Sequence, residues 1–317
     1  MEEEATVRPM GKLAFLLPGQ GSQKVGMGSD LLAERPELLE GYLEQAQAAS
    51  GLPIRQLCLE GPIEALTATD AAQPALFCVA LATADLARES GVRPDFAAGH
   101  SLGEYTAAVV AGALSPEDGI KLVSARGALM AAAQDELPGG MAAVLGLEAD
   151  KVAALCDSID GRVTPANFNT PSQIVVSGDL DAIDKLVEAA PEAGASRAIK
   201  LQVGAAFHSE AMVPVQAKMA ERMAEVEFRD PTIPIVSNAS GAVVTTADGI
   251  REALLAQIAS PVRWVDCVNT LADAGVDTYL ELGPGKVLIG LVRQIRDGMD
   301  ITAADSPKKV AKFAERS

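Results

Sequence analysis

The chain is poor in positive charge and in aromatic residues, and each shortage argues against a class of function. Among its 317 residues, 26 Lys and Arg are set against 43 Asp and Glu, which gives a formal net charge of −17. Proteins bind nucleic acids and anionic membrane surfaces through clustered Lys and Arg, so we expect neither as a partner. Aromatic residues make up only 3% of the chain, which leaves few stacking platforms for single-stranded nucleic acid.

Cysteine and histidine are also scarce. The chain has two histidines and four cysteines, and the cysteines show no Cys-x-x-Cys spacing: Cys58, Cys78, Cys156 and Cys267. A zinc site takes four ligands, mostly Cys and His, at short spacings, so we expect no metal. We interpret the cysteines as buried free thiols in a reducing cytosol.

Long apolar runs are absent as well. None approaches the roughly 20 residues that a membrane-spanning helix needs. The sequence starts Met1-Glu2-Glu3-Glu4, whose charge is opposite to that of a signal peptide. We therefore expect a cytoplasmic protein.

Strand-like and helix-like segments alternate along most of the chain, which predicts an α/β fold with a mainly parallel sheet. Segment 138–203 differs, because its pattern reads β-α-β-β-α-β, which is typical of a ferredoxin-like unit. We expect 138–203 to be an inserted small subdomain. Residues 1–137 and 204–317 would then form the core.

One short motif carries nucleophile chemistry: Gly99-His100-Ser101-Leu102-Gly103. A short apolar strand enters it and a helix leaves it, which is the setting of a G-x-S-x-G nucleophile elbow. The backbone N–H of Leu102 would open the helix and be free to stabilise an oxyanion. The alternative is a Gly-Ser turn at a strand–helix junction.

A serine nucleophile needs a base, and the two histidines are the candidates. His100 adjoins Ser101, so its side chain should point away, and we interpret it as a packing residue. His208, at a predicted loop–helix junction, is then the candidate base. No motif singles out a carboxylate that would orient it.

Several further motifs occur in a fixed order: FLLPGQGSQ (15–23), GHSLGEY (99–105), SARGALM (124–130), AFHS (206–209), SPVRW (260–264) and ELGPGKVL (281–288). Together they resemble the malonyl-CoA:acyl carrier protein transacylases, the acyltransferases of fatty-acid and polyketide synthesis. The resemblance implies an α/β-hydrolase-like core with an inserted ferredoxin-like subdomain.

The resemblance also implies roles for single residues. Ser101 corresponds to the nucleophile and His208 to the general base, which is oriented by the backbone carbonyl of Gln257. The backbone N–H groups of Leu102 and Gln20 correspond to the oxyanion hole, and the glycines beside Gln20 would let that loop approach the thioester.

Substrate-binding roles follow in the same way. Arg126 corresponds to the arginine that binds the free carboxylate of malonyl, and a guanidinium can do so bidentately. Phe207 resembles the residue found in malonyl-selective members, and Asn169 is expected to line the pocket.

The implied reaction is ping-pong transfer from malonyl-CoA to the phosphopantetheine thiol of an acyl carrier protein. It needs no tightly bound cofactor, and we expect a monomer. For the acidic carrier protein, the candidate docking surface is Lys286, Arg293 and Arg296. The alternatives are a trans-acting polyketide acyltransferase with another extender unit, an acyl-carrier-protein hydrolase or esterase, and a catalytically silent docking module.

Overall fold

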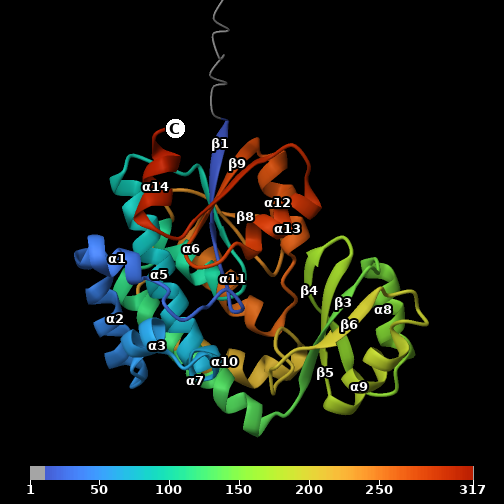
Figure 1. Ribbon diagram of the computed structural model, residues 1–317. Coiled ribbons are helices and arrows are strands. Elements are labelled where there is room, and N and C mark those ends of the chain that lie inside the picture. Colours follow the sequence, from blue (N-terminus) through green and yellow to red (C-terminus); the bar gives the residue numbers. More distant parts are fainter. Residues whose placement is uncertain (1–10, 317) are drawn as a thin grey trace, which may run out of the picture.

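A six-stranded sheet forms the centre of the larger part of the molecule (Figure 1). The computed structural model describes residues 11–316, so the acidic start of the chain, on which the argument about a signal peptide rests, lies outside the described residues. The strand order is β10-β9-β1-β2-β7-β8, and all neighbours run parallel except β7 and β8. The prediction of an α/β fold with a mainly parallel sheet is thus confirmed. The strands are β1 (Lys12–Leu17), β2 (Phe96–Gly99), β7 (Ile235–Val236), β8 (Val243–Val244), β9 (Val276–Leu282) and β10 (Asp300–Ala304).

The central strand β1 is buried on both faces. Its side chains point alternately to one face and the other. Leu13, Phe15 and Leu17 belong to one apolar cluster, and Ala14 and Leu16 to another. Helices therefore cover both sides of the sheet. The first face packs against helices that include α5 (Thr69–Glu89), α6 (Gly103–Val110) and α7 (Pro116–Glu136). The second face packs against α12 (Trp264–Asp273) and α13 (Val287–Ile295).

Two helices near the start of the core are separated by a single residue. The chain turns at Arg35, because a residue before proline is disfavoured in helical conformation. No helix within residues 11–316 is long and apolar enough to cross a membrane. The remaining helices of the core are α1 (Ser29–Glu34), α2 (Pro36–Ser50), α3 (Ile54–Glu60), α4 (Ile63–Thr67), η1 (Glu210–Met212), α10 (Val213–Met223), α11 (Ala247–Ala259) and α14 (Pro307–Ala314).

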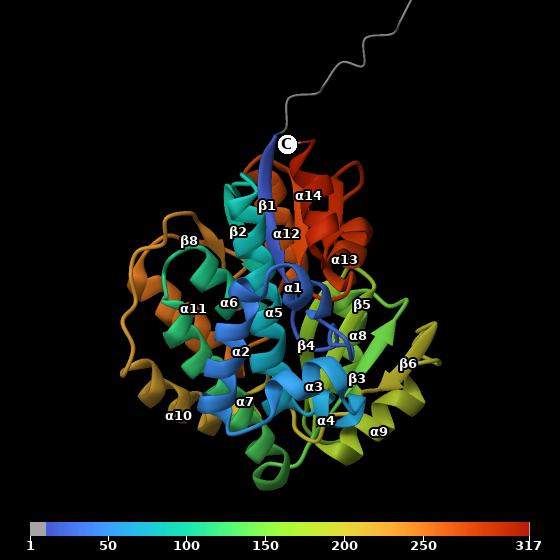
Figure 2. The same ribbon diagram turned by 60° about the vertical axis from the view of Figure 1, so that its left-hand side comes forward.

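A smaller, antiparallel sheet lies to one side of this core, in green and yellow in Figures 1 and 2. Its strand order, β4-β5-β3-β6, places the first strand of the unit beside the third and the fourth. Two helices and the sheet share their own apolar cluster. The elements are β3 (Gly140–Leu145), α8 (Ala149–Ser158), β4 (Val163–Thr170), β5 (Gln173–Gly178), α9 (Leu180–Ala189) and β6 (Arg197–Lys200).

The chain enters and leaves this small unit through adjacent segments. Pro138 and Ala205 form an antiparallel bridge, and the Gly139 N–H donates to the Gly204 carbonyl at 3.0 Å. Paired connections of this kind are compatible with an insertion between two halves of a core. The bounds 138–203 stay a prediction.

Candidate active site

Ser101 lies in a tight turn at the carboxyl end of β2, directly before α6. A Cβ atom on Gly99 would overlap the backbone of Gly103, and one on Gly103 would overlap the carbonyl of Leu17. Only glycine therefore allows β1, β2 and α6 to approach this closely. Ser101 itself has φ +52°, in the left-handed region that non-glycine residues seldom occupy. This is the strained geometry of a nucleophile elbow.

Asn238 joins the first residue of the elbow, Gly99, to the nucleophile Ser101. Its Oδ1 accepts a hydrogen bond from the Ser101 N–H at 2.7 Å, and its Nδ2 donates to the Gly99 carbonyl at 2.7 Å. The side chain is completely buried and follows β7, the sheet neighbour of β2. Sequence reasoning missed this residue, although a polar residue just after a buried strand is a usable signal, because ligands bind at the carboxyl edge of parallel sheets.

Ser101 and His208 form a hydrogen-bonded pair, with 2.8 Å between Ser101 Oγ and His208 Nε2. His208 Nδ1 lies 2.7 Å from the backbone carbonyl of Gln257. Because a carbonyl only accepts, Nδ1 carries the proton and Nε2 is free to accept one. Burial, followed by the positive charge of Arg126, lowers the pKa of His208 to about 3. The imidazole is therefore neutral at physiological pH.

Arg126, on α7, points its guanidinium at the nucleophile. Its Nη2 donates to Ser101 Oγ at 3.0 Å and to Gln257 Oε1 at 2.9 Å, and its Nη1 donates to Gln73 Oε1 at 2.7 Å. The side chain is only 1% exposed. Within the described part of the chain it forms no ion pair. Burial lowers its pKa, but a guanidinium stays protonated in proteins. The site thus contains a buried positive charge whose hydrogen-bond partners are all neutral.

Gln257 joins these groups through its side chain as well as its backbone. Its Nε2 donates to the Ser101 carbonyl at 2.8 Å and to Glu104 Oε2 at 3.1 Å. Burial raises the pKa of Glu104 to about 8, although the Asn238 backbone, the Gln257 amide and Arg126 oppose the shift. Most of this carboxyl is therefore protonated at pH 7.

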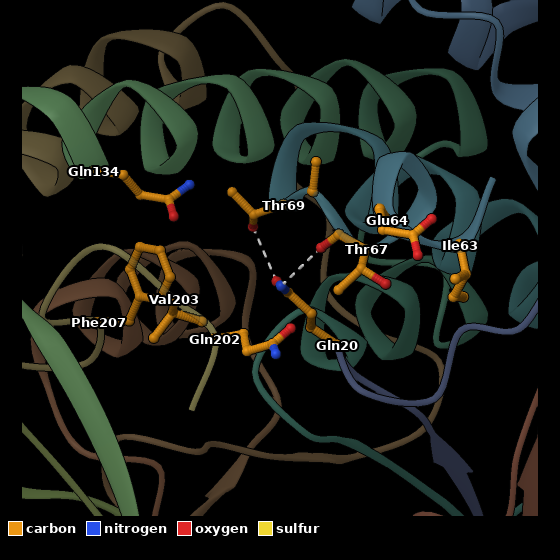
Figure 3. A pocket seen from close by; sticks show the side chains of 10 residues that line it. Gln20, Ile63, Glu64, Thr67, Thr69, Gln134, Gln202, Val203 and Phe207 are labelled. Atoms are coloured by element: carbon orange, nitrogen blue, oxygen red, sulfur yellow. Dashed lines mark hydrogen bonds between the residues drawn. The ribbon is translucent and has the colours of Figure 1, made fainter. Parts of the chain in front are cut away.

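Gln20 lies at one wall of a pocket of about 330 Å³ (Figure 3). Its amide oxygen accepts from Thr69 Oγ1 at 2.9 Å, and its amide nitrogen donates to the Thr67 carbonyl at 3.4 Å. Phe207, next to His208, lines the same pocket with Val203. The other lining residues are Ile63, Glu64, Ala68, Gln134 and Gln202.

The Gln20 loop packs directly on the elbow. A Cβ atom on Gly19 would overlap the carbonyl of His100, so glycine permits this contact. Among residues 11–316, neither the Gln20 N–H nor the Leu102 N–H donates a hydrogen bond. Leu102 also precedes the first turn of α6, where backbone donors are unpaired and the helix dipole is positive.

Asn169 contacts His100 rather than the pocket beside Gln20. Its Oδ1 lies 2.8 Å from His100 Nε2, and the His100 ring packs on Trp264 with ring centroids 5.5 Å apart. Asn169 is not among the residues that line this pocket. It therefore links β4 of the small sheet to the elbow.

Between residues 11 and 316, no group of three or more His, Cys, Asp and Glu side chains could hold a metal ion. All four cysteines are free and buried. The groups that meet at the elbow are a serine, a neutral histidine and a buried guanidinium.

Comparison with known proteins defines the class of protein that this fold and site represent. The family described as acyl transferase domain matches residues 14–311, and the chain belongs to it. Among curated relatives, the malonyl CoA-acyl carrier protein transacylases of Bacillus subtilis and Escherichia coli K12 are 41% and 40% identical. These alignments cover 95% and 96% of this chain, and 96% and 100% of the relatives.

Solved structures of similar chains carry the same kind of name as these curated relatives. The malonyl-CoA:acyl carrier protein transacylase of Xanthomonas oryzae has a TM-score of 0.91 at 40% identity, covering 96% of this chain and 98% of the other. A malonyl-transacylase solved in complex with its type II PKS acyl-carrier protein has a TM-score of 0.91 at 35% identity, covering 96% and 100%. The resemblance stated from the sequence motifs is confirmed.

Proposed function

We propose that this chain transfers a malonyl group from malonyl-CoA to the phosphopantetheine thiol of an acyl carrier protein. The observation that carries the proposal is Arg126, a buried cation that contacts Ser101 and has only neutral partners. A buried charge without a counter-ion is costly, so this site favours an acyl group that brings a carboxylate. The names of the relatives support the same donor and acceptor.

In the first half-reaction, Ser101 Oγ attacks the thioester carbon while its proton passes to His208 Nε2. The N–H groups of Leu102 and Gln20 stabilise the oxyanion that forms. When the carbon–sulfur bond breaks, His208 returns the proton to the CoA sulfur. The product is a malonyl ester on Ser101, whose carboxylate pairs with Arg126.

In the second half-reaction, the phosphopantetheine thiol attacks the ester carbonyl. His208 now takes the thiol proton and delivers it to Ser101 Oγ as the ester bond breaks. Malonyl leaves as a thioester of the carrier protein, and the enzyme is regenerated. No step needs a tightly bound cofactor.

A panel of acyl donors and acceptors tests this function. We expect malonyl-CoA to acylate the protein far faster than acetyl-CoA, and a carrier-protein thiol to take the group faster than water does. Release to water alone would favour the acyl hydrolase or esterase. Equal use of malonyl-CoA and other extender units, with a polyketide carrier protein preferred, would favour a trans-acting polyketide enzyme.

The carrier protein is proposed to dock at Lys286 and Arg293. Both side chains are exposed and form no ion pair within the described residues, whereas Arg296 pairs with Asp273 at 3.0 Å. Reversing the charge of Lys286 and Arg293 should raise the KM for carrier protein without affecting acylation by malonyl-CoA. Unchanged transfer to carrier protein would refute this surface.

We further propose a cytoplasmic monomer whose segment 138–203 is a distinct subdomain. Four free buried cysteines support a reducing compartment, and the separate apolar cluster of the small sheet supports the subdomain. Sedimentation equilibrium tests the monomer, and limited proteolysis near residues 138 and 204 tests the bounds.

A further inference from the structure

Glu104, a buried carboxyl group, borders the site without a part in the proposed mechanism. It lies in the first turn of α6 and is 1% exposed. Its Oε2 accepts a hydrogen bond from Gln257 Nε2, while Oε1 has no hydrogen-bond partner among the described residues. A buried carboxylate is normally paired and fully hydrogen-bonded. Glu104 is buried and has no cation in direct hydrogen-bond contact among the described residues, which favours the neutral acid.

Gln257 lies between Glu104 and Arg126. Its amide nitrogen donates to Glu104 at 3.1 Å, and its amide oxygen accepts from Arg126 at 2.9 Å. In the part of the chain that the structure describes, Glu104 and Arg126 form no ion pair. The guanidinium thus meets a neutral amide oxygen where a carboxylate would have neutralised it.

We propose that Glu104 is a positioning residue: through the Gln257 amide it holds the Arg126 guanidinium beside Ser101 without pairing with it. The positive charge is then left to the carboxylate of the acyl group. This inference rests on the proposed transfer of malonyl. An ionised Glu104 would compete with that carboxylate, because two anions would share one cation.

The surroundings of Glu104 determine its charge. The titratable groups that interact with it are Tyr105 on α6, Arg126 on α7 and Cys267 on α12. Burial raises the pKa of Tyr105 and of Cys267, so both are neutral at pH 7 and Arg126 is the charged member of the three. Burial also keeps Glu104 protonated until alkaline pH. The inference therefore predicts that malonyl binding weakens when Glu104 ionises.

The test measures malonylation of Ser101 by rapid quench, with malonyl-CoA and no acceptor, between pH 6.5 and about 9.5. The variant Glu104→Gln keeps an amide oxygen that can accept from Gln257 and cannot ionise. In the unmodified protein, the malonyl-CoA concentration for half-maximal acylation should rise about tenfold above pH 8. In Glu104→Gln it should stay constant and should equal that of the unmodified protein at pH 7. Acetyl-CoA should show no difference between the two proteins.

Gln257→Glu is the positive control, because it places a carboxylate against Arg126. It should weaken the binding of malonyl-CoA at every pH by a larger factor than that of acetyl-CoA, and the ratio of the two is compared because the variant also removes the amide that donates to the Ser101 carbonyl. The same pH dependence in the unmodified protein and in Glu104→Gln would overturn the inference. So would weaker malonyl binding by Glu104→Gln at pH 7, which would make Glu104 an anionic partner of Arg126.

Thermal unfolding checks that each variant is folded. If Glu104→Gln does not fold, the unmodified protein alone decides. Weaker binding of malonyl-CoA but not of acetyl-CoA at alkaline pH supports the inference, and a parallel weakening of both refutes it. Absence of malonylation at pH 7 would instead refute the proposed function, so the two failures are distinguishable.

Discussion

Arg126 Nη2 lies 3.0 Å from Ser101 Oγ, the same oxygen that lies 2.8 Å from His208 Nε2. The hydroxyl therefore donates to the histidine and accepts from the arginine. Selection of a carboxylated acyl group and activation of the nucleophile thus occur within hydrogen-bond distance of one atom. A substrate carboxylate bound to Arg126 would bring the thioester carbon to Ser101.

Replacing Ser101 by alanine should abolish covalent labelling by radioactive malonyl-CoA, because no other group in the dyad can form the ester. The measurement is acid-quenched labelling resolved by gel electrophoresis. Ser196→Ala, an exposed serine of the small unit, is the matched control and should label normally. Undiminished labelling of Ser101→Ala would refute the assignment of the nucleophile.

Replacing Arg126 by alanine should lower kcat/KM for malonyl-CoA by about 100-fold or more, because a buried charge pair is worth several kcal/mol. The loss for acetyl-CoA should be much smaller, so the ratio of the two rates is the decisive quantity. Arg293→Ala, at an exposed arginine, should leave this ratio unchanged. An equal loss for both donors would show that Arg126 is only structural.

His208 should act as a base down to unusually low pH. Burial and Arg126 lower its pKa to about 3, and the base is active while unprotonated. The rate of Ser101 modification by phenylmethylsulfonyl fluoride, an uncharged reagent, should therefore show no histidine step between pH 5 and about 8. In Arg126→Ala, the pH below which this rate falls should be higher, because the positive charge that lowers the pKa of His208 is gone. A step near pH 6.5 in the unmodified protein would contradict this prediction.

The same shift affects stability. Between the unfolded pKa near 6.5 and the folded value of about 3, the unfolded chain binds the extra proton. The free energy of unfolding should therefore decrease as pH falls through this window, and this decrease should be smaller in His208→Gln.

Replacing Asn238 by alanine should lower kcat more than it raises KM, because Asn238 holds the elbow and does not line the pocket beside Gln20. The free energy of unfolding should fall by about 2–4 kcal/mol, since a buried carbonyl and a part-buried N–H of the backbone lose their partner. Steady-state kinetics and urea unfolding measure both effects. Asn269→Ala, which removes only a contact to Arg296, is the control. An unchanged kcat in a destabilised Asn238→Ala protein would show that Asn238 does not position the nucleophile.

The central strand and the elbow could be predicted from sequence, because local constraints define them. A short apolar run, two glycines and a following helix fix the backbone path around Ser101 largely through neighbouring residues. The elements at the end of the chain, β10 and α14, were not predicted from the sequence. Strand β10 gives a weak pattern, because it is half-buried and pairs only at the edge of the sheet. Helix α2 begins separately at Pro36 for a local reason that the sequence did contain.

The sequence by itself determined the nucleophile turn, the small number of candidate bases and the family to which the chain belongs. Only the tertiary structure decided which groups surround them. Asn238 reaches the site because β7 lies beside β2, and Glu104, three residues after Ser101, meets Gln257 from a distant part of the chain. Whether Arg126 is solvated or buried without a counter-ion depends on segments more than 50 residues away. Such contacts follow from the order of strands in the sheet, which no local pattern of residues encodes.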